Sequence, residues 1–163
     1  MSQRAKSLLM GAFFGVVLGA WAMHYWLAAP PPATRAQYPH AAIEMVTRAT
    51  KMLNTHGDEA LAMFDRDARF NRPDSYLFVL AADGTNIYHA ADSAQVGEDY
   101  SILHDINQRP FGRQLVNDID PQGVWLAYRW NNPATATPEW KLTFTRQTQK
   151  GHIVAAGIHG GPE

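Results

Sequence analysis

The stretch 123–130 carries the side chains best suited to the wall of a small-ligand site. If it is a strand, its side chains alternate between faces, so Tyr128 and Trp130 share one side while Trp125 faces the other. Tyrosine and tryptophan offer a rigid apolar ring with one polar group, which suits a pocket for a small molecule. The same rings also serve to fill a core, and the residues alone leave both interpretations open.

Three basic side chains are candidates for holding an acidic group of a ligand. Lys141 opens a later strand-like stretch, and a buried ammonium there needs a partner, either a ligand carboxylate, an acidic residue or solvent. His89 can donate a hydrogen bond, and Arg109, beside Pro110, can bind a carboxylate through two parallel hydrogen bonds. Lys141 also fits a solvated strand end, His89 a surface position, and Arg109 either the sheet or solvent.

The sequence contains no recognisable catalytic or metal-binding pattern. It has no cysteine, which excludes disulfides, thiolate catalysis and zinc sites built on cysteine. Phosphate loops, nucleophile elbows and dinucleotide fingerprints are absent. His104 and Asp105 lack further ligands, and His152 and His159 fall on opposite faces of a strand. We therefore expect neither an enzyme nor a protein with a bound metal or cofactor.

The first part of the chain predicts a membrane anchor. Residues 8–29 hold no formally charged side chain and would span roughly 33 Å as a helix. Arg4 and Lys6 precede this run, so residues 1–7 are expected in the cytoplasm and the rest of the chain on the other side. A cleaved signal peptide is the alternative; the length of the run and the proline-rich linker at 30–37 favour a retained anchor.

Residues 38–163 are expected to form one soluble domain. With Arg4 and Lys6 set aside, residues 30–163 hold 12 basic and 15 acidic residues, a balance that argues against nucleic-acid binding. Helices are predicted at 39–57, from Asp58 to before Pro73, and at 105–119, and strands at 76–82, 85–91, 124–131, 141–148 and 152–159. Short connections between strands predict an α+β fold of PAS-like layout with a five-stranded antiparallel sheet.

Several motifs in this domain resemble the single Cache domain family. The first half matches through Tyr76-x-Phe78-Val79, Asp83-Gly84, His89 and Gly97; the second matches through Gly123-x-Trp125-x-x-Tyr128-x-Trp130-x-x-Pro133, Lys141 and Gly157. The resemblance covers about residues 40–160. It implies an extracytoplasmic sensor that binds small molecules, commonly organic acids, on one face of the sheet. It also favours a ligand-binding role for Lys141, and completes the candidate set: Tyr76, Phe78, His89, Arg109, Trp125, Tyr128, Trp130 and Lys141.

The resemblance further implies a role in signalling. Members of the family are usually fused to a kinase, a chemoreceptor or a cyclase, whereas here the predicted cytoplasmic part is only residues 1–7. We therefore expect a single-pass protein of the cytoplasmic membrane whose periplasmic or extracellular domain acts with a separate kinase, chemoreceptor or transporter. The alternative is a structural or interaction subunit without a ligand. A sheet face closed by its own side chains would favour that alternative, and an enclosed aromatic pocket with Lys141 pointing in would favour a sensor.

Overall fold

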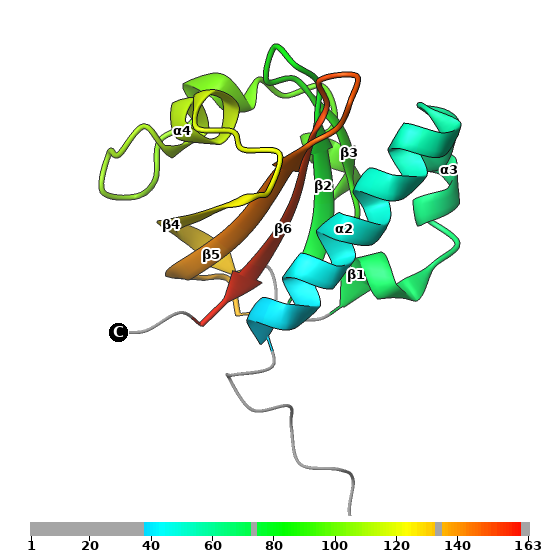
Figure 1. Cartoon of the computed structure of the whole chain (residues 1–163). Coiled ribbons are helices and arrows are strands. Elements are labelled where there is room, and N and C mark those ends of the chain that lie inside the picture. Colours follow the sequence, from blue (N-terminus) through cyan, green and yellow to red (C-terminus); the bar gives the residue numbers. More distant parts are fainter. Residues whose placement is uncertain (1–37, 73–74, 133–134, 161–163) are drawn as a thin grey trace, which may run out of the picture. The chain divides into compact units, whose positions relative to one another are not determined.

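In the computed structural model of the chain, residues 38–72, 75–132 and 135–160 are described (Figure 1). The predicted anchor at 8–29, the N-terminal residues 1–7 and the linker 30–37 lie outside these ranges. Among the described residues, no helix has both the length and the apolar character needed to cross a bilayer. The described residues therefore all belong to the predicted soluble domain.

The domain is an α+β fold with an antiparallel sheet, as predicted. All five predicted strands are present, and a sixth, of two residues, precedes them. The strands are β1 (Asn71–Arg72), β2 (Ser75–Leu80), β3 (Asn86–His89), β4 (Val124–Asn132), β5 (Thr137–Gln147) and β6 (Ile153–His159). Their order is β1-β2-β6-β5-β4, with β3 also paired to β2. The prediction of five strands was wrong by one because a two-residue strand carries no periodicity to detect.

The first hairpin turns where the sequence predicts. Gly84 has a positive φ of 95°, a conformation that glycine adopts without steric cost. The backbone N–H of Gly84 donates to the carbonyl of Ala81 at 3.0 Å, and that of Thr85 donates to Oδ1 of Asp83 at 2.9 Å. The Asp83-Gly84 pair therefore supplies both the turn and its local hydrogen bonds.

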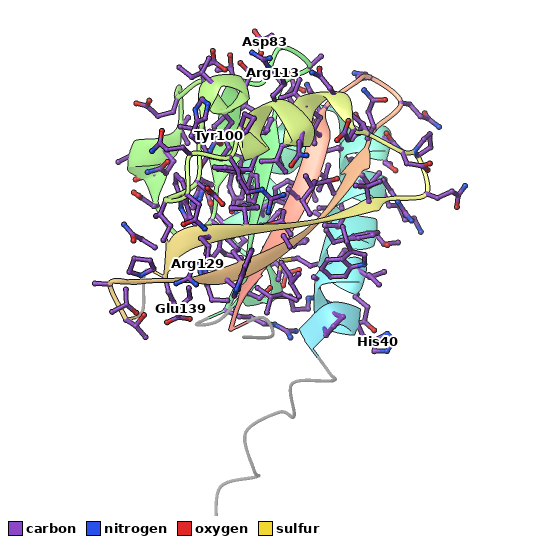
Figure 2. The ribbon with its side chains drawn as sticks, turned by 90° about the vertical axis from the view of Figure 1, so that its left-hand side faces the viewer. His40, Asp83, Tyr100, Arg113, Arg129 and Glu139 are labelled. Carbon is purple, nitrogen blue, oxygen red and sulfur yellow. The ribbon has the colours of Figure 1, made fainter. Side chains whose placement is uncertain are left out.

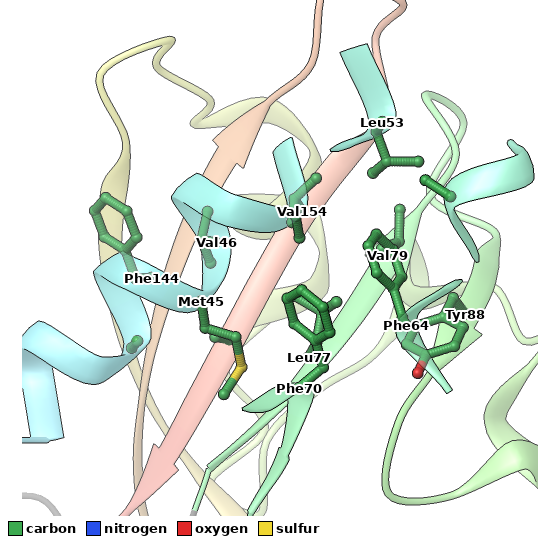
Figure 3. Close-up of a cluster of buried hydrophobic side chains, with 14 of the residues drawn as sticks. Met45, Val46, Leu53, Phe64, Phe70, Leu77, Val79, Tyr88, Phe144 and Val154 are labelled. Carbon is green, nitrogen blue, oxygen red and sulfur yellow. The ribbon is translucent and has the colours of Figure 1, made fainter. Parts of the chain in front are cut away.

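The helix α2 (Tyr38–His56) lies across one face of the sheet (Figure 1). Its buried residues recur at helical spacing, and it ends at Gly57, which has a φ of 60° and donates its N–H to Leu53 O at 2.9 Å. The buried residues of α2 include Ala42, Met45, Val46, Ala49 and Leu53. They pack on apolar side chains of β2, β5 and β6, chiefly Leu77, Val79, Phe144 and Val154 (Figure 3). Each large apolar side chain buried here contributes about 1.5–3 kcal/mol.

The remaining helices are short and only partly match the sequence prediction. The α3 helix (Glu59–Phe64) is followed by a 3-10 turn at Ala68–Phe70, where one helix was expected to reach Pro73. The α4 helix covers Phe111–Asn117 rather than 105–119. Residues 105–110 form a turn, in which the Asp105 carboxylate accepts the N–H groups of Asn107 and Arg109 and Gln108 has a φ of 63°, outside the helical range.

The strand β6 is buried along its whole length and separates two clusters of side chains. Val154, Ala156 and Ile158 pack with α2, whereas Ile153 and Ala155 belong to a second cluster on the opposite face. Figure 2 shows Tyr100 on this second side, with the sheet between it and α2. The second face carries the site described next.

Candidate functional site: a cavity on the face away from α2

Lys141 lies buried in the middle of this second face. In the sheet register it is directly opposite Tyr128 on β4 and His159 on β6. Only 3% of Lys141 is exposed, and its Nζ donates a hydrogen bond to the Tyr76 hydroxyl at 2.7 Å. The ammonium also lies 4.4 Å from the ring centroid of Tyr76 and 5.3 Å from that of Phe78. These distances allow cation–π attraction, so aromatic rings replace part of the water that the ammonium has lost.

A glycine on β6 makes room for this lysine. A Cβ placed on Gly157 would lie inside van der Waals contact of Lys141 Cε and 2.9 Å from its Nζ. The lysine side chain therefore crosses β6 over the position where any other residue would have a side chain. Gly157 is a positioning residue for Lys141, because it lets the ammonium reach Tyr76 on the far side of β6.

Lys141 has no acidic partner within the part of the chain that the structure describes. No Asp or Glu oxygen there lies within 4.0 Å of its Nζ. Burial lowers the pKa of Lys141 from 10.5 to about 7, because the charged form loses its hydration. The site thus holds an ammonium that an incoming anion would stabilise in its charged form.

We expect the free energy of unfolding of the ligand-free protein to rise between pH 7 and about pH 9.5. In this range Lys141 keeps its proton in the unfolded chain, where its pKa is 10.5, but loses it in the folded protein, where burial lowers the pKa to about 7. The unfolded state therefore binds more protons, and the free energy of unfolding increases by at most about 1.4 kcal/mol per pH unit. Urea unfolding across this range measures the effect. The rise should be missing in Lys141→Met, and a wild-type protein with flat or falling stability would contradict the assignment.

The Lys141 ammonium faces a cavity of about 270 Å³. The lining residues are Tyr76, His89, Asp92, Gln95, Tyr100, Phe111, Tyr128, Trp130, Asn131 and Lys141. Phe111 of α4 stacks on Tyr128 with ring centroids 4.0 Å apart, and Trp130 meets Phe111 edge-on at 5.2 Å. The Tyr128 hydroxyl is hydrogen-bonded to Thr143 at 3.0 Å, which leaves its ring to form the wall. The cavity therefore combines a buried cation with flat apolar walls.

His89 presents a neutral donor to the same cavity. Its Nδ1 accepts the backbone N–H of Asp92 at 2.9 Å, so the hydrogen of the neutral ring resides on Nε2. Burial, followed by the nearby charge of Lys141, lowers the pKa of His89 to about 4. At neutral pH the ring is uncharged and offers an N–H from Nε2.

A loop anchored by Asp105 carries Phe111 over the cavity. Asp105 is 2% exposed, and its carboxylate accepts the backbone N–H groups of Asn107, Arg109 and Arg129 at 2.8–3.2 Å. Burial raises the pKa of Asp105, but the backbone hydrogen bonds outweigh burial and hold that pKa below its usual value. Asp105 thus ties the loop before α4 to β4, which also supplies Tyr128 and Trp130.

We expect Asp105→Ala to lower the free energy of unfolding by about 1–3 kcal/mol, because three backbone donors lose their acceptor. Urea unfolding measures the loss, and faster amide exchange at Asn107 and Arg109 would place it in this loop. Asp105→Asn keeps one carbonyl acceptor and should lose less. Equal stability of Asp105→Ala and the wild type would rule out this anchoring role.

The structure brings five of the eight predicted site residues together around the cavity: Tyr76, His89, Tyr128, Trp130 and Lys141. Phe78 lies just behind them, under the Lys141 ammonium. Two residues lie elsewhere. Arg109 has an exposed side chain, because its backbone is held in the Asp105 turn. Trp125 is on the α2 side of the sheet, 39% exposed and 5.1 Å from the Phe144 ring, as strand alternation requires.

Several residues of the site were not predicted. Tyr100, Gln95 and Asp92 lie in irregular segments, which have no periodicity to detect. Phe111 is the first residue of α4, whereas the sequence predicts a helix that begins at residue 105. The sequence assigns His159 no role in a ligand site. It is 7% exposed, both its ring nitrogens are without a hydrogen-bond partner within the described ranges, and its ring centroid lies 6.2 Å from that of Tyr76. Its place opposite Lys141 follows from the β5–β6 register, which one sequence does not display.

A larger hollow, of about 520 Å³, lies along α2 beside β1. Its charged side chains, which include Arg48, Lys51 and Arg72, are exposed to solvent. Hydrated surface charges need no ligand, whereas a buried ammonium does. We therefore place the candidate site at Lys141. No group of three or more His, Asp or Glu residues among the described residues is arranged to hold a metal ion.

A helix across one face of an antiparallel sheet and a cavity on the other face together give the layout of a PAS-like domain. The chain belongs to the family Single Cache domain 2, whose model matches residues 37–157. This is a family of sensory ligand-binding domains, found in chemoreceptors and histidine kinases that act in signal transduction. The resemblance drawn from the motifs is thereby confirmed.

Individual relatives agree with this family. The chain is 30% identical over 87 residues to the sensor histidine kinase MctS of Rhizobium johnstonii, a match that covers 53% of the chain but only 19% of the kinase. The fold is similar to a Cache chemosensory domain solved for its recognition of carboxylic acid (TM-score 0.61, 16% identity, 80% and 99% of the two chains). It is also similar to a methyl-accepting chemotaxis protein of Vibrio parahaemolyticus (TM-score 0.55, 17% identity, 91% and 94%).

Proposed function

We propose that this chain is a sensor module that binds a small carboxylic acid in the cavity beside Lys141. The observation that carries the proposal is the buried Lys141 ammonium, which faces a cavity and has no carboxylate within ion-pair distance among the described residues. A ligand carboxylate supplies the missing charge. The similarity to a chemosensory domain that recognises carboxylic acid supports the same class of ligand.

Three donors meet where the carboxylate would bind. Lys141 contributes its ammonium, and His89 contributes Nε2–H. The Tyr76 hydroxyl accepts from Lys141, so its own hydrogen is free to donate to the ligand. Burial raises the pKa of Tyr76, which keeps that hydrogen in place at neutral pH. Charge-assisted bonds of this kind are about twice as strong as neutral ones.

The cavity also limits the size of the ligand. A volume of about 270 Å³ lies just below the roughly 300–1,000 Å³ of pockets for drug-sized molecules, so a small acid suits it. Phe111, Tyr128 and Trp130 would contact the carbon part of the ligand. The sheet face beside Lys141 is hollowed and aromatic, which favours a sensor over an interaction subunit without a ligand, for which that face would be filled by its own side chains.

A thermal-shift screen of the full chain in detergent tests the ligand class. Short carboxylic acids should raise the melting temperature, whereas the corresponding amides, which match them in shape but carry no charge, should not. A ligand at a hundred times its Kd stabilises the folded protein by about 2.7 kcal/mol. If acids and amides act alike, or neither acts, the proposal fails.

We also propose that residues 8–29 anchor the domain on the non-cytoplasmic side of the cytoplasmic membrane, and that the domain acts with a separate kinase, chemoreceptor or transporter. The basic residues before the apolar run support this orientation, and the kinase and chemotaxis relatives support a signalling partner. Protease added to intact spheroplasts should remove a C-terminal tag. A protected tag would overturn the orientation.

A further inference from the structure

We propose that Asp92 makes this site select against ligands that carry a second negative charge. The inference rests on the proposed binding of a carboxylate at Lys141. It concerns the rest of the ligand beyond that carboxylate, which should be neutral or cationic.

Asp92 lines the same cavity as Lys141, from the segment that follows β3. Its position is fixed by three hydrogen bonds. Oδ1 accepts the backbone N–H of Ala94 at 3.0 Å, Oδ2 accepts from Gln95 Nε2 at 3.2 Å, and its own backbone N–H donates to His89 Nδ1 at 2.9 Å. Held in this way, the Asp92 carboxylate does not come within ion-pair distance of Lys141. The Lys141 ammonium and the Asp92 carboxylate therefore line the same cavity without forming an ion pair with each other.

Apart from Lys141, no charged group of the described lining offsets Asp92. Gln95, Tyr100 and Asn131 are neutral, and His89 is uncharged at neutral pH. The negative charge of Asp92 acts on the neighbouring tyrosines of the lining. Together with burial, which is the larger cause, it raises the pKa of Tyr76 and of Tyr100. Glu98, nearby, acts on Tyr100 in the same direction.

A second carboxylate on the ligand would thus approach a fixed negative charge. For two like charges about 6 Å apart, Coulomb repulsion weakens binding by about threefold in bulk water and by about a hundredfold at the dielectric typical of a protein surface, so for the exposed Asp92 we expect an intermediate loss of about tenfold. Because Asp92 is exposed, salt should reduce this effect. A ligand ammonium at the same position should be tolerated or favoured.

Three ligands with the same carbon chain separate these effects: butyrate, succinate and 4-aminobutyrate, which end in a neutral, an anionic and a cationic group. Calorimetric titration of the full chain in detergent, at low salt and about pH 7, where succinate carries both negative charges, should show succinate binding about tenfold more weakly than butyrate, and 4-aminobutyrate no more weakly than butyrate. In Asp92→Asn, which retains an acceptor for Ala94, the difference between succinate and butyrate should shrink several-fold. Added salt should shrink it in the wild type only.

Asp99→Asn is the matched control. Asp99 caps a 3-10 turn in the same way as Asp92, through the N–H of Ser101, but does not line the cavity. It should leave the selectivity unchanged. If butyrate binds and Asp92→Asn leaves the ratio to succinate as it was, the role of Asp92 is wrong while carboxylate binding stands. If none of the three ligands binds the wild type, the proposed function fails and this inference fails with it.

Discussion

Lys141→Met is expected to be more stable than the wild-type protein and to bind carboxylic acids roughly a hundredfold more weakly. The two effects have one cause. The ammonium is buried without an acidic partner among the described residues, so replacing it by an unbranched apolar chain removes a desolvation cost of about 1–3 kcal/mol. The same change removes the charge that holds the ligand, and loss of one member of a buried charge pair costs about 2–5 kcal/mol of binding.

Urea unfolding and calorimetric titration measure these two effects separately. Lys51→Met is the control, because Lys51 is an exposed lysine of α2 on the other side of the sheet. It should change neither quantity appreciably. A Lys141→Met protein that is less stable than the wild type would show that the lysine is already neutralised in the ligand-free state.

Gly157→Ala is expected to abolish binding although every side chain that contacts the ligand remains. The added methyl group would occupy the space of Lys141 Cε and lie 2.9 Å from Nζ, so the lysine must leave Tyr76. Overpacking of this kind costs about 1–3 kcal/mol of stability. The binding loss should approach that of Lys141→Met, because in both variants the ammonium is missing from the cavity.

A double-mutant cycle tests whether the methyl group acts through the lysine. In Gly157→Ala combined with Lys141→Ala, the space vacated by the lysine accepts the new methyl group, so the double variant should be more stable than the sum of the single changes predicts. Strict additivity in urea unfolding would mean that Gly157→Ala acts on the backbone of β6 instead.

Elements with a clear period were predictable from the sequence, and irregular ones were not. The α2 helix and the five longer strands follow the spacing of their apolar residues, and Asp83-Gly84 marked the first turn. The helix expected from residue 105 failed because the Asp105 side chain captures the backbone N–H groups of its neighbours. Such a local competition depends on Asp105 being buried against β4, which residue spacing does not reveal.

The site was predictable where it depends on alternation along one strand, and not where it depends on pairing between strands. Alternation placed Tyr128 and Trp130 on one face and Trp125 on the other. By contrast, residues alone left Lys141 open to a solvated position. Its burial requires the gap at Gly157 on the neighbouring strand, and this depends on the β5–β6 register. His159 was missed for the same reason.

The strand β6 is buried along its whole length and directly connects the cavity side of the sheet with the α2 side. Its residues alternate between the cavity side, with Gly157 and His159, and the α2 side, with Ala156 and Ile158. β6 is hydrogen-bonded to β2 on one edge and to β5 on the other. A ligand that displaced Gly157 would therefore also displace its neighbours in the chain, Ala156 and Ile158, which face α2. The cavity side and the α2 side of the sheet are therefore only one residue apart along β6.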